Sequence, residues 1–110
     1  MTEMYHRYQQ HLATPSDIQH HLPLLFSLAR GNVLELGTRG GVSTAALLAG
    51  VERQGGMLIS VDIEDCSQVA AGHAQWAFWK GSSTDESMAQ DIATYAGPFS
   101  LILIDTEHTF

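Results

Sequence analysis

The chain has 110 residues, a formal net charge of −7 and only 5 Lys and Arg residues. This length bounds it to one domain, and the acidic balance argues against a nucleic-acid backbone or an anionic membrane as the main partner. The single cysteine excludes an internal disulfide. The start of the sequence lacks the pattern of a secretory leader, and its aliphatic runs are too short to span a bilayer, so we expect a soluble, cytoplasmic protein.

Residues 1–30 predict an N-terminal helical segment. Residues 1–12 are polar and predict a weak helix or a frayed arm. Thr14 followed by Pro15 is typical of a helix start, and apolar residues then recur at helical spacing. Pro23 interrupts that spacing, so the helix either kinks or restarts there.

From residue 31 onward, strand and helix patterns alternate, which is typical of a parallel sheet with crossover helices. Ser83 and Glu86 form a capping box that predicts the start of the last helix. The fold class we expect is α/β, a Rossmann-like, mostly parallel sheet with strand order 3-2-1-4. The expected strands are 33–36, 57–61, 76–79 and 99–104, and the expected helices are 42–51, 66–73 and 84–95.

The turn after the first strand, residues 37–41, is rich in glycine. Gly37 and Gly41 would let the backbone approach a ligand at a helix N-terminus, an arrangement that suits phosphate. Glu35, however, would repel a pyrophosphate and could hold an ammonium or sulfonium group. A cationic cofactor therefore fits better than a dinucleotide, whose Gly-x-Gly-x-x-Gly pattern is also not met.

Polar residues follow each later strand, and the carboxyl ends of parallel strands meet at one edge. Asp62 lies 25 positions after Gly37, close to the spacing at which an acid accepts hydrogen bonds from ribose hydroxyls. Ile63 could pack on an adenine face, and Ser82 or Ser83 could bond the adenine edge, although Ser83 could equally be a helix cap. Together these residues indicate S-adenosylmethionine as the cofactor.

The chain resembles the N-terminal part of a class I S-adenosylmethionine-dependent methyltransferase. The matching segments are 35–41, 61–63, 79–83 and 103–110, and the last is similar to a segment of macrocin-type small-molecule O-methyltransferases. The resemblance implies a partial cofactor-binding domain over residues 31–110, truncated after the fourth strand. Its cofactor-binding residues would be Glu35, Gly37, Thr38, Arg39, Gly41, Asp62, Ile63, Gly81, Ser82 and Ser83. Arg39 departs from the family, which most often has glycine there, and we expect Gly40 to keep the turn flexible.

Two residues after the fourth strand are candidates for catalysis. His108 has the side chain expected of a base that removes a proton from the methyl acceptor, and Asp105 could orient it, touch the methionine moiety or begin a metal site. Because further metal ligands are lacking, no metal is expected in this chain. His6, His11, His20 and His21 have no spacing that fits a tight metal site.

The main functional hypothesis is O-methylation of a small-molecule substrate, with this chain supplying the cofactor-binding half. The alternative is a non-catalytic remnant or half-module that acts through association. In either case the fourth strand would form an edge of the sheet beside aliphatic residues 101–104, which predicts a homodimer through that edge or poor solubility.

Overall fold

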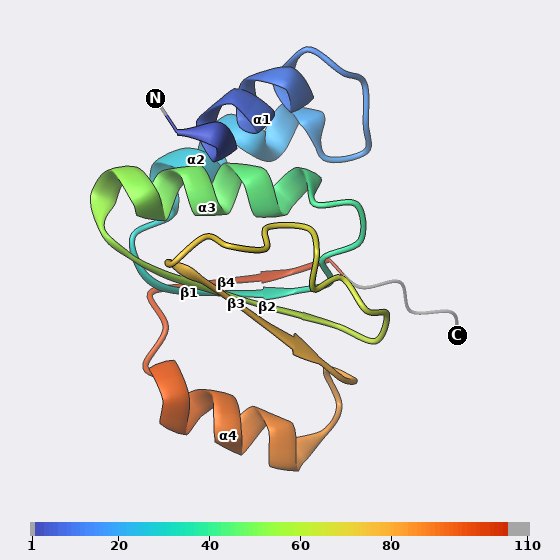
Figure 1. The fold of residues 1–110 in the computed structure, drawn as a ribbon, viewed down its shortest axis with the longest axis vertical. Helices are drawn as coiled ribbons and strands as arrows, with labels where there is room; N and C mark the ends of the chain where they lie inside the picture. The colour runs from blue at the N-terminus through green and yellow to red at the C-terminus, as the bar shows by residue number, and fades with distance from the viewer. Residues whose placement is uncertain (1, 106–110) are drawn as a thin grey trace.

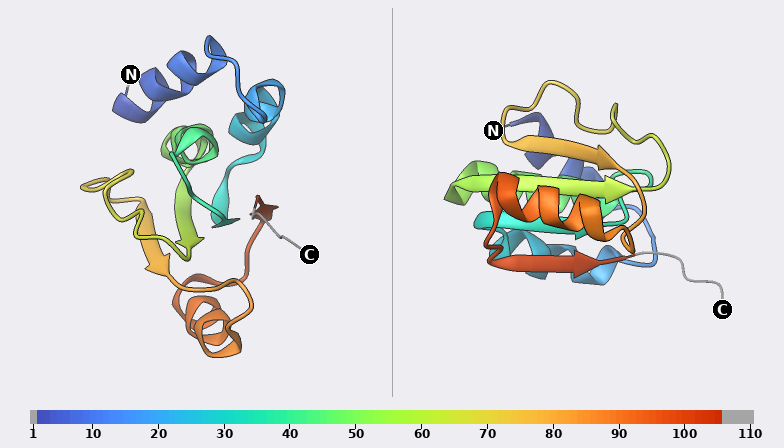
Figure 2. Two further views of the ribbon diagram at one scale, coloured as in Figure 1. Left: turned by 90° about the vertical axis from the view of Figure 1, so that its right-hand side faces the viewer. Right: turned by 90° about the horizontal axis from the view of Figure 1, so that it is seen from below.

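The computed structural model describes residues 2–105 and contains one four-stranded parallel sheet. The strands lie in the order β3-β2-β1-β4 and point in the same direction (Figure 2). This arrangement confirms the predicted Rossmann-like α/β fold and its strand order. The strands are β1 (Gly31–Leu36), β2 (Gly56–Asp62), β3 (Trp76–Lys80) and β4 (Leu101–Ile104).

Helices cover both faces of the sheet (Figure 1). On one face, α3 (Val42–Gln54) lies next to the sheet, with α1 (Glu3–Leu12) and α2 (Leu22–Leu28) packed on it. On the other face lies α4 (Glu86–Ala96), which shares a smaller core with buried residues of β2. The period of two along the strands separates these cores, since alternate side chains point to opposite faces.

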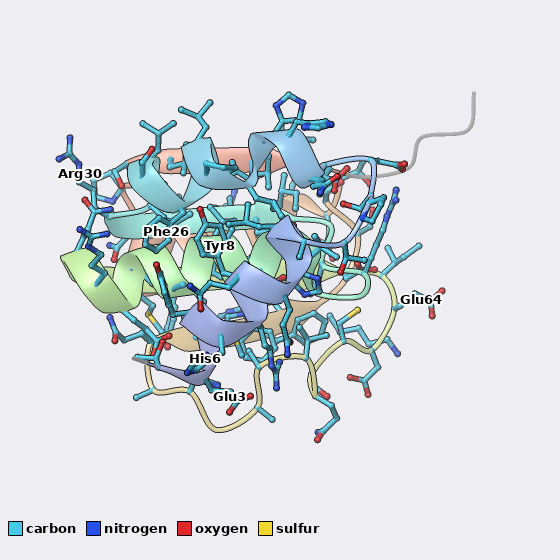
Figure 3. All side chains as sticks on the ribbon, turned by 90° about the horizontal axis from the view of Figure 1, so that it is seen from above. Glu3, His6, Tyr8, Phe26, Arg30 and Glu64 are labelled. Atoms are coloured by element: carbon cyan, nitrogen blue, oxygen red, sulfur yellow. The ribbon has the colours of Figure 1, made fainter. Side chains whose placement is uncertain are left out.

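The N-terminal segment is firmly packed. Thr2 caps α1 by accepting a hydrogen bond from the Tyr5 backbone N–H, at 3.1 Å, and Met4 and Tyr8 are buried. The Tyr8 ring stacks on Phe26 of α2 at a centroid distance of 4.6 Å (Figure 3). Residues 3–12 therefore form a helix that belongs to the core, and the prediction of a frayed arm was wrong.

The helix predicted to begin at Thr14 does not form. The Thr14 hydroxyl instead donates back to the Gln10 carbonyl oxygen, and only a short 3-10 turn, η1 (Gln19–His21), precedes α2. Pro23 lies in the first turn of α2. Backbone N–H groups there have no acceptor within the helix, so a proline, which lacks this group, loses no helical hydrogen bond. The structure thus shows a restart rather than a kink.

The helix predicted for residues 66–73 is also absent, and turns connect β2 to β3. The Asp65 carboxylate accepts from both the backbone N–H and the hydroxyl of Ser67, which competes with helical hydrogen bonding. Gly72 then adopts a φ of +89°, which is outside the helical region. At α4 the cap is Asp85, which accepts from the Met88 N–H, so the predicted capping box at Ser83 was wrong.

Candidate functional site

The turn between β1 and α3 is built from three residues with positive φ: Gly37 (+102°), Arg39 (+49°) and Gly41 (+89°). A Cβ atom on Gly41 would lie 2.5 Å from a methyl carbon of Val69, so this glycine is required by close packing as well as by its φ. The left-handed position falls on Arg39 itself and not on Gly40, contrary to the expectation that Gly40 would provide the flexibility.

Asp62, at the end of β2, holds this turn from the neighbouring strand. Its Oδ2 accepts hydrogen bonds from the N–H groups of Thr38 at 2.8 Å and Arg39 at 3.0 Å, and its Oδ1 accepts from the Glu64 N–H at 3.0 Å. Partial burial alone would raise the pKa of Asp62, but these N–H donors, together with the Cys66 thiol, outweigh that effect and lower it. Asp62 is therefore a firmly anionic group that fixes the turn.

Glu35 was predicted to balance the amino group of the ligand, directly or through water, and the structure places it inside the protein. Its side chain is fully buried on the α3 side of the sheet, and it lines neither of the two clefts beside the turn. Its carboxylate accepts hydrogen bonds from three hydroxyls: Ser43 at 2.5 Å, Thr44 at 2.7 Å and Ser60 at 2.8 Å. Successive side chains of a strand point to opposite faces of the sheet. Glu35 therefore points toward α3, beneath the glycine turn, and not out of the carboxyl end of β1.

The Glu35 cluster ties three elements together. Ser43 and Thr44 lie in the first turn of α3, and Ser60 lies directly opposite Glu35 on β2. The Trp76 indole N–H of β3 donates in turn to the Ser60 hydroxyl, at 2.9 Å. The sequence analysis did not identify Ser60 as a neighbour of Glu35. Each residue lies one position before the end of its predicted strand, 33–36 or 57–61, so parallel pairing of these strands with their ends aligned would have placed the two residues opposite each other.

Desolvation raises the pKa of Glu35 to about 7, although the three hydroxyl donors oppose this rise by favouring the charged form. The negative charge of Asp105 adds a smaller upward contribution. Glu35 is thus a buried residue that holds α3 and β2 together behind the glycine turn. Its negative charge is costly to maintain because the side chain is desolvated.

A cleft of about 480 Å³ opens at the carboxyl ends of the strands, a volume typical of small-molecule sites. Its lining brings together residues that follow all four strands, as the sequence predicted for this edge. Thr38 lines a neighbouring cleft instead, Gly41 lines neither cleft, and His108 lies outside the described residues. The predicted site residues that line this first cleft are Gly37, Arg39, Asp62, Ile63, Gly81, Ser82, Ser83 and Asp105.

The charged residues of the first cleft favour a cationic ligand. Asp62, Glu64 and Asp105 supply three carboxylates against the single guanidinium of Arg39. Glu64 projects from the loop after β2 (Figure 3). Such a lining would repel a pyrophosphate and attract an ammonium or sulfonium group.

The same cleft also provides suitable groups for a nucleoside. The side chain of Ile63 is 66% exposed and offers an apolar surface. Ser82 and Ser83, which follow the neighbouring strand β3, provide hydroxyls at the same edge of the sheet. A Cβ atom on Gly81 would lie 2.5 Å from the Met88 sulfur, so glycine keeps this part of the loop close to α4.

Two further observations concern the described part of the chain. Among residues 2–105, no three His, Cys, Asp or Glu side chains gather closely enough to hold a metal ion. Within the same residues, none of the helices has the length and apolar character needed to cross a membrane.

A parallel sheet in the order β3-β2-β1-β4 with a cleft at its carboxyl edge defines a Rossmann-like class of α/β protein. Comparison with known families narrows this class. Residues 34–110 match the model of a methyltransferase domain, and the chain belongs to that family. No curated protein matches the chain.

Proposed function

We propose that this protein binds S-adenosylmethionine in the first cleft and transfers its methyl group to a hydroxyl of a small molecule. The observation that supports this most is the convergence of strand-end residues on one acidic cleft, in a chain that belongs to a methyltransferase-domain family. A macrocin-type O-methyltransferase is the subfamily we propose. The single cysteine agrees with a cytoplasmic location, which we retain as part of the proposal.

The lining residues fit the parts of this cofactor. Asp62 is held anionic by backbone N–H groups and is suited to accept from ribose hydroxyls. Ile63 would pack on the adenine face, with Ser82 and Ser83 at its edge. Arg39 would meet the carboxylate of the methionine part, while the acidic lining would attract its ammonium and sulfonium groups.

When bound, the cofactor supplies an electrophilic methyl group on a sulfonium centre. The protein must then orient the acceptor hydroxyl, remove its proton and exclude water. Asp105 lies at the end of β4, where its backbone N–H donates to the Leu36 carbonyl oxygen at 2.8 Å. It can orient the acceptor or the base, and we retain His108 as the proposed base.

Cofactor binding is tested by calorimetry with S-adenosylmethionine and S-adenosylhomocysteine. Ile63→Ser should weaken both affinities about tenfold, because it removes an apolar contact worth about 1.4 kcal/mol. Leu28→Ser is the matched control, since Leu28 is also exposed, at 46%, and lines neither cleft. Absence of any binding heat in the unmodified protein would contradict the proposed function.

Catalysis is tested separately by following transfer of a labelled methyl group to small hydroxylated acceptors. Transfer that Asp105→Asn reduces by a larger factor than it reduces cofactor affinity would support an enzyme. Cofactor binding with no transfer to any acceptor would favour the non-catalytic binding module.

A further inference from the structure

A second cleft, of about 460 Å³, lies beside the glycine turn. It shares Arg39 and Asp105 with the first cleft, so the two cavities meet at the end of β4. A molecule in the second cleft would therefore lie next to one in the first, separated by these shared residues.

The two sides of this cleft come from different parts of the chain. One side belongs to the methyltransferase-family match and includes Val42 and Leu103. The other is formed by Ile18, His21 and Leu24 of the N-terminal segment, which precedes the first matched residue, 34. The first cleft is instead lined only by residues within the match. The family-matched part thus forms the first cleft by itself, whereas the second depends on the segment that precedes it.

One buried polar group beside the second cleft has no partner within residues 2–105. Thr38 lines this cleft and is only 2% exposed, yet its hydroxyl has no hydrogen-bond partner among the described residues. An unpaired buried hydroxyl costs about 1–3 kcal/mol, so such groups are normally satisfied. The Thr38 backbone N–H meanwhile donates to Asp62, which links the residue to the first cleft.

The remaining lining indicates the chemistry of a ligand for this cleft. Six of the fourteen lining residues are aliphatic, including Ile18 and Leu24, so part of the ligand should be apolar. The carboxylates of Asp17 and Asp105 outnumber the guanidinium of Arg39 in this lining, so an anionic ligand is disfavoured. The volume suits a molecule of one or two rings.

We propose that the second cleft is the methyl-acceptor site and that it takes a small, partly apolar alcohol or phenol without a negative charge. This inference rests on the proposed function and deepens it, because it locates the acceptor beside the cofactor cleft at Asp105. It also assigns selection of the acceptor to residues 16–25, outside the part of the chain that carries the family match.

The test uses 2-naphthol as the probe and compares Leu24→Trp with Leu28→Trp. Both leucines are exposed on α2, one helical turn apart, but only Leu24 lines the second cleft. In the unmodified chain, NMR titration with 2-naphthol should shift resonances of residues 16–25 and Val42. Leu24→Trp should weaken this binding at least about tenfold by filling the cleft, while Leu28→Trp should leave it unchanged.

S-adenosylhomocysteine affinity, measured on the same three proteins, distinguishes the inference from the function on which it rests. It should stay within about twofold in both variants, because neither leucine lines the first cleft. If S-adenosylhomocysteine binds but 2-naphthol shifts no resonance of residues 16–25, or binds Leu24→Trp undiminished, the acceptor site is wrong and the cofactor site stands. If S-adenosylhomocysteine does not bind the unmodified chain, the proposed function fails and the acceptor role fails with it.

Discussion

Glu35 combines complete burial with three hydroxyl donors, and its pKa is raised to about 7 by desolvation. In the unfolded chain this carboxyl titrates near 4.5, so between these values the folded state binds more protons than the unfolded state. Stability should therefore fall as the pH rises from about 4.5 to 7, by up to about 3 kcal/mol. This loss of stability should be complete once the pH exceeds the pKa of Glu35 in the folded protein.

Glu35→Gln should remove this pH dependence, because an amide does not titrate in this range. We expect the free energy of unfolding, from urea denaturation at pH 5 and pH 8, to differ less in the variant than in the unmodified protein. Histidines and exposed acids titrate in both proteins, so the difference between the two profiles isolates Glu35. Parallel profiles would contradict the raised pKa.

Arg39 is held at a φ of +49°, a conformation that costs a residue with a Cβ about 1 kcal/mol relative to glycine. Arg39→Gly should therefore be about 1 kcal/mol more stable to urea than Arg39→Ala, since both variants lose the arginine side chain equally. Gly40 is the matched control, because it has no positive φ and open space around its Cβ position. Gly40→Ala should be at least as stable to urea as the unmodified protein. A preference for glycine over alanine at both position 39 and position 40 would contradict the assigned geometry.

How much of the site could be predicted from the sequence depends on what determines the direction of each side chain. Strand ends converge at one edge in any parallel sheet, so Asp62, Ile63 and Ser82 were placed in the cleft from their sequence positions alone. The direction of Glu35 depends on strand alternation and on hydroxyl donors from α3 and from the neighbouring strand β2, the latter 25 positions away in sequence. Its burial could not be inferred from the glycine turn.

At the scale of elements, the sheet and its flanking helices were predictable because hydrophobic periodicity and glycine breaks agree there. The region around residues 66–73 was not, because its composition allows a helix while the Asp65 side chain binds the backbone locally. For α1 the polar surface concealed the anchor Met4, one helical turn before Tyr8, and the partners of this helix lie in α2 and α3. Local side-chain hydrogen bonding thus decided the structure of residues 66–73, and long-range packing decided that of α1.

The packing of α1 can be tested with Met4→Ala. Met4 is 1% exposed in the main core, so its truncation should lower the free energy of unfolding by about 2–4 kcal/mol in urea titrations followed by Trp76 and Trp79 fluorescence. Gln9→Ala, at an exposed position of the same helix, should change it by less than about 0.5 kcal/mol. Equal, small effects of the two substitutions would indicate an α1 that frays in solution.

At the scale of the whole molecule, the sheet is covered unevenly. On the α4 side, the core gathers residues of β2 and β3, including Trp79, which contacts Tyr95 of α4 at a centroid distance of 5.8 Å. On the same side, Ile102 and Ile104 of β4 are 52% and 66% exposed. β4 is also the edge strand of the described sheet, paired only with β1 (Figure 2). An unpaired strand edge beside exposed aliphatic side chains favours pairing with another strand.

We propose that two copies of the chain pair through their β4 edges, since a two-fold axis there would bring identical edges and isoleucines together. Light scattering coupled to size-exclusion chromatography should then show a dimer that dissociates on dilution. Ile102→Lys should weaken it at least about tenfold, because each copy would place a charge at the shared edge. Leu28→Lys, an equal change on exposed α2, should leave the dimer intact, so a monomer at every concentration, or equal weakening by both variants, would exclude pairing at β4.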